Sequence, residues 1–238
     1  HLAAARIRRL AAMGEDVSQM AVVYPKQSGY GALLQNILPM YGLATYVAEK
    51  RKAGAHPLSR FILSALAAIS AGWRLSDILE CAQSDFLGLT QEALDRFCAY
   101  CEGADVRGEA MRKPFRYPKG VTEEELVALE ESRKQVMEPL LALQRGLQAA
   151  KTADDTIQTI LTLLESVHAY ETLEDMRDEL NAADLAAEAQ DCAQVWNAMM
   201  TTLDQLHTLL GGQAIPAKIV LELLQNGLSA LELAALPP

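Results

Sequence analysis

The chain has 238 residues, a formal net charge of −10, an apolar content of one half, and four cysteines. This length predicts one or two domains with a sizeable apolar core. Four cysteines spread over such a chain do not form a disulfide scaffold, which favours a reducing, cytoplasmic location. The sequence contains no apolar run of the length that a transmembrane helix needs.

The charge is unevenly distributed. Residues 1–120 carry 15 Lys and Arg against 11 Asp and Glu, whereas residues 121–238 carry 6 against 20. Each phosphate contact needs a cation, so we expect any nucleic-acid contact to come from the first half. The acidic half is expected to face solvent or a partner protein.

The first 55 residues predict a partial α/β layer. Residues 20–24 form an apolar segment typical of a short strand, and residues 44–47 form a second one. Between them, an amphipathic helix is indicated by Leu33, Leu34, Ile37, Leu38 and Tyr41. Strand, helix and strand in this order are typical of nucleotide-binding α/β folds.

From His56 onward the apolar spacing is helical. Pro57 opens a helix expected to end at Gly72, and Ser76 and Thr90 are expected to cap the next two. Thr122 and Glu125 predict a capping box. Four helices are predicted in the remaining chain. The first begins at residue 123, with a kink or break at Pro139, and the second covers residues 153–170. The third begins at residue 172 or 180 and ends at residue 210, before Gly211 and Gly212, and the fourth begins at Pro216.

Several segments occur in the order of a known family. They are residues 21–24, Tyr30, residues 41–46, 56–58, 61–66, Gly72 with Trp73, and residues 76–79, 94–100 and 103–108. In this order they resemble the B subunit of the AddAB/RexAB-type ATP-dependent helicase–nuclease, which processes broken DNA ends for recombination. The resemblance covers about residues 6–115.

The resemblance implies an architecture and a set of partners. Residues 1–55 would be a partial second RecA-like helicase domain, and residues 56–238 a helical insertion domain, giving a mainly α fold. The partners would be DNA and the A subunit of the same complex. ATP, Mg and an iron–sulfur cluster are implied for the full complex, and none of them for this chain. The absence of an initial methionine leads us to expect a piece of a larger protein.

Two features concern nucleotide binding. Related active helicases place an arginine after the first strand, whereas this chain has Pro25 followed by Lys26. Proline cannot donate to phosphate, and lysine lacks the planar fork of arginine. The turn Ser28–Gly31 precedes a helix, but Leu34 replaces the third glycine of a dinucleotide-binding pattern. A flexible helix entry is therefore the favoured interpretation, and a nucleotide-binding enzyme is the weakest functional alternative.

The metal and catalytic motifs are incomplete. Cys98 and Cys101 form a C-x-x-C pair, but two further ligands are missing. The four histidines have no metal-binding spacing, and His56 is expected to form hydrogen bonds at a helix cap. We predict no catalytic residue and no metal site in this chain.

The non-periodic segment 104–120 is the strongest functional candidate. It contains seven basic or aromatic side chains that we predict to contact nucleic acid: Arg107, Arg112, Lys113, Phe115, Arg116, Tyr117 and Lys119. Cations reach phosphates, and aromatic rings stack on unpaired bases. The alternative is that Phe115 and Tyr117 fix the loop to the helices while the cations remain solvated.

Two functional hypotheses follow from these patterns. The first is a non-catalytic segment of a helicase–nuclease B subunit in double-strand-break processing, which contacts DNA, the partner subunit or both. The second is a freestanding α-helical scaffold for protein interactions. Salt-sensitive DNA binding through residues 107–119 distinguishes the first from the second.

Overall fold

The computed structural model describes residues 1–25, 29–43, 51–115 and 121–233. The chain divides into two compact units, one built mainly from His1–Arg51 and the other from Lys52–Leu233. Helices dominate the described residues, which confirms the mainly α fold class. None of the helices in the described ranges combines the length and the apolar character that crossing a membrane requires.

The first unit contains helix α1 (Leu2–Ala12), the 3-10 turn η1 (Val17–Gln19) and helix α2 (Tyr30–Met40). Its small core consists of Ala4, Leu38 and Leu43, with Ile7 and Val17 packed against them. The amphipathic helix predicted between the two strand segments is therefore present as α2.

The strand predicted for residues 20–24 is wrong, because this segment is not a β-strand. The Val23 side chain is 94% exposed, and no described strand lies alongside to pair with the segment. An extended segment becomes a strand only through such pairing. The second predicted strand, residues 44–47, lies outside the described residues. The RecA-like assignment of residues 1–55 and the domain limits at residues 55 and 56 therefore stay predictions.

The second unit begins and ends in a two-stranded sheet of β1 (Arg51–Lys52) and β2 (Glu232–Leu233). The Ala53 N–H donates to the Leu231 carbonyl at 2.9 Å. The turn η2 (Ala53–Ala55) then leads into α3 (Pro57–Ser70), whose predicted start at Pro57 is confirmed. His56 Nδ1 accepts from the Leu58 N–H at 3.2 Å, which confirms its predicted role at the cap.

Helix α4 (Leu75–Ala82), the turn η3 (Asp85–Leu87) and α5 (Gln91–Gly103) follow. Thr90 caps α5 through a 3.3 Å bond from the Ala93 N–H, as predicted. Ser76 is not a cap, because α4 already begins at Leu75 with Arg74 at the N-cap. Trp73 adopts φ 64°, so the chain turns before Ser76 is reached.

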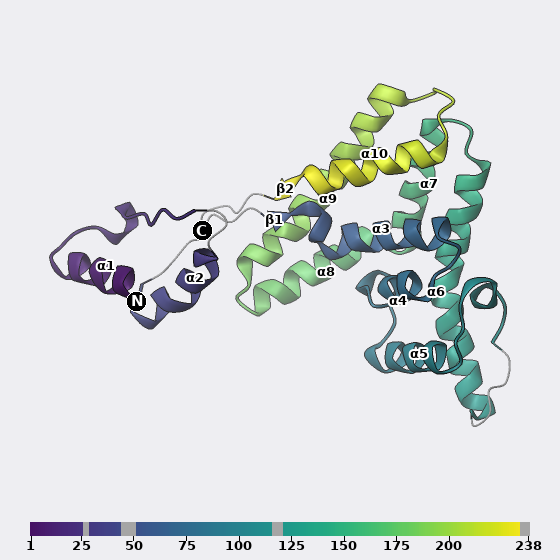
Figure 1. Cartoon of the computed structure of the whole chain (residues 1–238), viewed down its shortest axis with the longest axis horizontal. Helices are drawn as coiled ribbons and strands as arrows, with labels where there is room; N and C mark the ends of the chain where they lie inside the picture. The colour runs from purple at the N-terminus through teal and green to yellow at the C-terminus, as the bar shows by residue number, and fades with distance from the viewer. Residues whose placement is uncertain (26–28, 44–50, 116–120, 234–238) are drawn as a thin grey trace. The chain divides into compact units, whose positions relative to one another are not determined.

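Helix α6 (Glu123–Ala149) is the longest element, and Figure 1 shows it as one continuous helix. The predicted capping box is confirmed, since Thr122 and Glu125 bond each other's backbone N–H groups. Of the kink or break predicted at Pro139, the break is wrong, because the helix continues through this residue, and the kink stays a prediction. Proline removes one backbone donor, and the buried neighbours Val136, Met137 and Leu140 keep this face of the helix packed.

Where the sequence predicted two further helices, the structure has three. Helix α7 (Ala153–Ser166) ends before His168, α8 (Ala169–Ala182) follows, and α9 (Ala186–Leu210) begins after Asp184. His168 and Asp184 have φ values of 50° and 59°. The chain changes direction at each of these residues, so the following helix packs against the helix before it. The predicted termination of α9 is confirmed, because Gly211 has φ 27°.

Helix α10 (Ala217–Ala230) begins after Pro216 as predicted. It packs on α9, and α7 packs on α6, α8 and α9. Both α6–α7 and α9–α10 use a glycine facing a threonine. A methyl group at Gly146 would collide with Thr159 Cγ2, and one at Gly227 would lie 2.9 Å from Thr202 Cγ2. These glycines therefore set how closely the helix pairs approach.

The first prediction concerns His56. Burial lowers the pKa of His56 to about 4, and the charge of Asp191 opposes the shift. The unfolded chain takes up this proton near pH 6.5, so His56 stabilises the fold above that pH and the contribution is lost as the pH falls toward 4. His56→Asn retains a capping acceptor. Between pH 6.5 and pH 4, the free energy of unfolding of this variant should therefore fall by up to about 3 kcal/mol less than that of the wild type.

Urea unfolding of the wild type and the His56→Asn variant at pH 7 and pH 4.5 (about two units below the ordinary histidine value) measures this difference. Acidic groups also contribute to the pH dependence, and the comparison cancels them because both chains contain the same ones. An identical loss of unfolding free energy in the two chains would contradict the assignment.

The second prediction concerns Gly146. Alanine normally stabilises a helix interior by about 1 kcal/mol relative to glycine. Here the added methyl collides with Thr159, a β-branched residue with few alternative rotamers. Gly146→Ala should therefore lower the free energy of unfolding by about 1–3 kcal/mol. Adding Thr159→Ala should restore most of the loss in thermal or urea unfolding.

The matched control for Gly146 is Gly103→Ala, because no atom lies within 4 Å of the Cβ built at Gly103 in α5. We expect this variant to be neutral or slightly stabilising. Equal destabilisation by the two substitutions would show that contact with Thr159 does not decide the effect at Gly146.

Candidate functional site

The basic loop, residues 104–120, connects α5 to α6, and the structure describes residues 104–115 of it. The segment contains the turn η4 (Gly108–Arg112), with Arg107 before the turn and Lys113 after it. The Gly108 N–H donates to the Trp73 carbonyl at 3.0 Å. The start of η4 is therefore attached to the turn between α3 and α4.

Three predicted cations of the basic loop are exposed. Arg107 pairs with Asp105 at 2.8 Å, with 69% of each side chain exposed. Arg112 pairs with Glu109 at 2.8 Å, and Lys113 is exposed. Solvent-exposed pairs of this kind contribute little free energy. A phosphate could therefore replace either carboxylate at low cost.

Phe115 is located differently from the solvated cations. Its side chain is buried, with its ring centroid 4.6 Å from that of Tyr100 and 6.2 Å from that of Phe97. A ring in this position anchors the loop and does not present a face to a base, which favours the anchoring alternative for this residue. Arg116, Tyr117 and Lys119 lie outside the described residues, so their nucleic-acid contacts stay predictions.

Two residues of α6 form hydrogen bonds with the backbone of the loop. Glu130 Oε2 accepts from the Phe115 N–H at 3.0 Å and from Arg133 Nε at 2.8 Å, while Glu130 Oε1 accepts from Arg133 Nη2. Arg133 Nη1 donates to the Met111 carbonyl at 3.3 Å. The guanidinium also lies 5.9 Å from the Phe115 ring centroid, which is within cation–π range.

This pair is largely buried, with 8% of the Arg133 side chain and 21% of the Glu130 side chain exposed. Burial raises the pKa of Glu130, but the hydrogen bonds from Arg133 and the Phe115 N–H outweigh it and hold the pKa below its usual value. Glu130 is thus ionised at neutral pH where it faces the Arg133 guanidinium. Neither was predicted from the sequence, although Arg133 lies between Leu129 and Val136 on the apolar face of α6.

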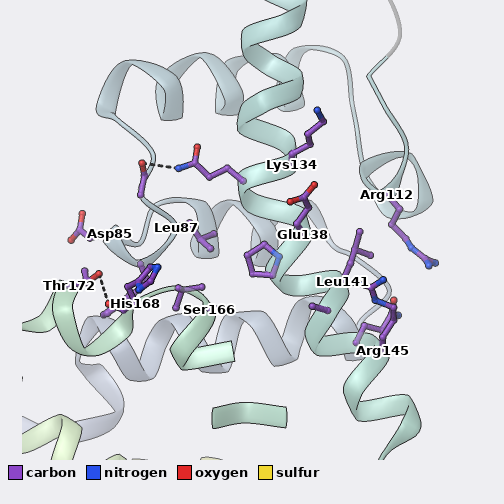
Figure 2. Close-up of a pocket in the computed structure, with 17 residues that line it drawn as sticks. Asp85, Leu87, Arg112, Lys134, Glu138, Leu141, Arg145, Ser166, His168 and Thr172 are labelled. Carbon is purple, nitrogen blue, oxygen red and sulfur yellow. Dashed lines mark hydrogen bonds between the residues drawn. The ribbon is translucent and has the colours of Figure 1, made fainter. Parts of the chain in front are cut away.

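A hollow of about 1070 Å³ runs along α6 beside the basic loop. Figure 2 shows Arg112, Lys134 and Arg145 to one side of this helix, and Asp85, His168 and Thr172 to the other. Glu138 lies between them. The Gln135 side chain donates to the Gly88 carbonyl at 3.0 Å. The positive charge of the basic loop thus continues onto α6, along the side of the hollow that Arg112, Lys134 and Arg145 line.

The C-x-x-C pair has no metal-binding environment. Cys101 is fully buried, and burial raises the pKa of its thiol to about 12. Burial also raises the pKa of Cys98, to which Glu102 and Asp95 add. Among the described residues, no three His, Cys, Asp or Glu side chains gather as a metal ion would require. These thiols therefore fit neither a cluster nor an activated nucleophile.

The turn before α2 gives no further support for a nucleotide site. Gly29 has φ 66° and precedes α2, whose N-terminus has no side-chain cap. Ser28 and Lys26 lie outside the described residues. The nucleotide hypothesis for this turn stays an alternative.

Comparisons with known proteins found several relatives that share one name. The chain matches no family model. It is 27% identical over 99% of its length to the B subunit of the ATP-dependent helicase/deoxyribonuclease of Symbiobacterium thermophilum. Proteins of the same name from Clostridium botulinum and Bacillus velezensis are 24% and 25% identical over 92% and 94% of the chain.

The chain spans about a fifth of the length of these curated relatives, 20–22%. The match extends through residues 116–238, where the sequence patterns alone indicated no specific resemblance. It confirms the inferred likeness and carries it over nearly the whole chain. The chain is thus similar, from end to end, to a segment of the B subunit of ATP-dependent helicase/deoxyribonucleases.

Proposed function

We propose that this segment is a non-catalytic part of a helicase–nuclease B subunit that acts on DNA ends in double-strand-break processing and recombination. Its role is to contact DNA through the basic loop. The observation that carries the proposal is the exposure of Arg107, Arg112 and Lys113 on a backbone that is bonded to Trp73 and to α6. ATP-driven and nuclease chemistry would lie elsewhere in the parent protein.

The geometry favours a path for the sugar–phosphate backbone. Arg112 of the loop lines the same hollow as Lys134 and Arg145 of α6. Cations spaced along a helix next to a loop suit a charged strand that needs no base-specific contacts. Within the part of the chain that the structure describes, Arg145 has no ion-pair partner, so its charge is free to meet a phosphate.

A second role, contact with the A subunit, is supported by the charge of α8. This helix presents exposed carboxylates at Glu171, Asp175, Asp178 and Glu179. Such a surface repels phosphates and suits a basic protein surface. In this proposal, DNA and the partner subunit occupy different faces of the second unit.

The third prediction tests DNA binding by fluorescence anisotropy of labelled single-stranded and forked DNA. Log affinity should fall linearly with log salt concentration. The triple variant Arg107→Ala, Arg112→Ala, Lys113→Ala should reduce the magnitude of the slope by about 2 on single strands, at roughly 0.7 for each lost phosphate contact. Affinity at about 50 mM salt should fall roughly tenfold or more.

The matched control is Arg60→Ala, Arg177→Ala, Lys218→Ala, which changes the net charge equally at sites on α3, α8 and α10. Arg60 and Lys218 are exposed and Arg177 is half-buried, and all three lie outside the basic loop and the hollow, so this variant should keep the wild-type slope. An equal loss in both triple variants would indicate a general charge effect. Absence of binding by the wild type at low salt would contradict the DNA contact and favour the scaffold hypothesis.

A further inference from the structure

Within the described part of the basic loop, the segment 108–115 is attached to its surroundings by hydrogen bonds at three backbone positions. The Gly108 N–H bonds the Trp73 carbonyl, the Met111 carbonyl bonds Arg133, and the Phe115 N–H bonds Glu130. The last two positions bracket Arg112 and Lys113. The cations proposed to meet DNA are therefore displayed on a short span whose two ends are held by the same pair of side chains.

Arg133 differs from the other cations around the loop in its exposure. Only 8% of its side chain is exposed, compared with 69% for Arg107, 38% for Arg112 and 48% for Lys134. Its guanidinium donates to Glu130 through two nitrogens and to Met111 through the third. A group whose three nitrogens all donate inside the protein is not available to a phosphate.

We propose that Arg133 and Glu130 are positioning residues, which fix the basic loop so that Arg112 and Lys113 face a DNA strand while neither positioning residue touches it. This inference rests on the proposed function. Holding the loop in the free protein would reduce the conformational entropy lost on binding. The arrangement requires arginine, because only a planar fork can bond Glu130 twice and Met111 once.

The fourth prediction uses two charge-conserving variants of neighbouring residues. Arg133→Lys keeps the charge but loses the fork, while Lys134→Arg changes an exposed cation that belongs to the hollow. Hydrogen exchange at residues 108–115, followed by mass spectrometry on the full chain, should be roughly tenfold faster in Arg133→Lys. Exchange in the core of α7 should remain at the wild-type rate, and Lys134→Arg should leave the loop unchanged.

The DNA readout separates positioning from structural support. Arg133→Lys should weaken single-strand binding by roughly three- to tenfold and flatten the salt dependence, although no charge is removed. In the Arg107→Ala, Arg112→Ala, Lys113→Ala background, the same substitution should have no further effect on binding, because the groups it positions are absent. A residue that only supports the fold would not show this dependence.

The outcomes are distinguishable. Unchanged loop exchange in Arg133→Lys would overturn the positioning role, whatever the DNA result. Faster loop exchange with unchanged DNA affinity would overturn it as well and leave the proposed function intact. Absence of DNA binding by the wild type would overturn the proposed function, and the positioning role with it.

Should Arg133→Lys fail to fold, as judged by circular dichroism, Glu130→Gln gives the same test. Its amide oxygen can still accept from the Phe115 N–H, while the charged pair with Arg133 is lost. We expect the same direction of change in loop exchange and in DNA affinity. A folded Glu130→Gln chain with wild-type values in both measurements would count against the proposal.

Discussion

Burial of the Arg133 guanidinium on the apolar face of α6 is the constraint on which the basic loop depends. Removing a charge from water costs several kcal/mol unless its partners compensate. Here the compensation comes from Glu130, from the Met111 carbonyl and from the Phe115 ring. Two of these partners belong to the loop itself. The loop cannot move away from α6 without leaving a buried charge short of hydrogen bonds.

Packing along the buried face of α6, on which Arg133 lies, explains why this helix continues through Pro139. At 27 residues it extends about 40 Å at 1.5 Å per residue, and it contacts α3, α4, α5 and α7. A break at Pro139 would separate Arg133 and Met137 from Leu140 and Leu143, which share its buried face. The lost packing would exceed the cost of one missing backbone hydrogen bond. Tertiary contacts thus override the local preference of proline.

The features that the sequence predicted correctly are those set by local chemistry. Thr90 and the Thr122–Glu125 pair cap helices because their side chains satisfy backbone N–H groups nearby. Gly211 ends α9 because its backbone enters a region that side chains disfavour. His168 and Asp184 were missed as helix breaks, since neither is a glycine or proline. Those reversals are imposed by the packing of α8 against α7 and α9, which no local pattern specifies.

In the candidate site too, some features follow from local chemistry and others from tertiary packing. Exposure of Arg107 and Arg112 followed from their charge, whereas the burial of Phe115 depends on rings of the preceding helix α5 that no local pattern pairs with it. Opposite charges three residues apart, as in Glu130 and Arg133, are typical of a solvated helix surface. The position of Arg133 on the apolar face of α6 was the signal for burial. A charged residue on such a face needs a partner from another segment, and here that segment is the basic loop.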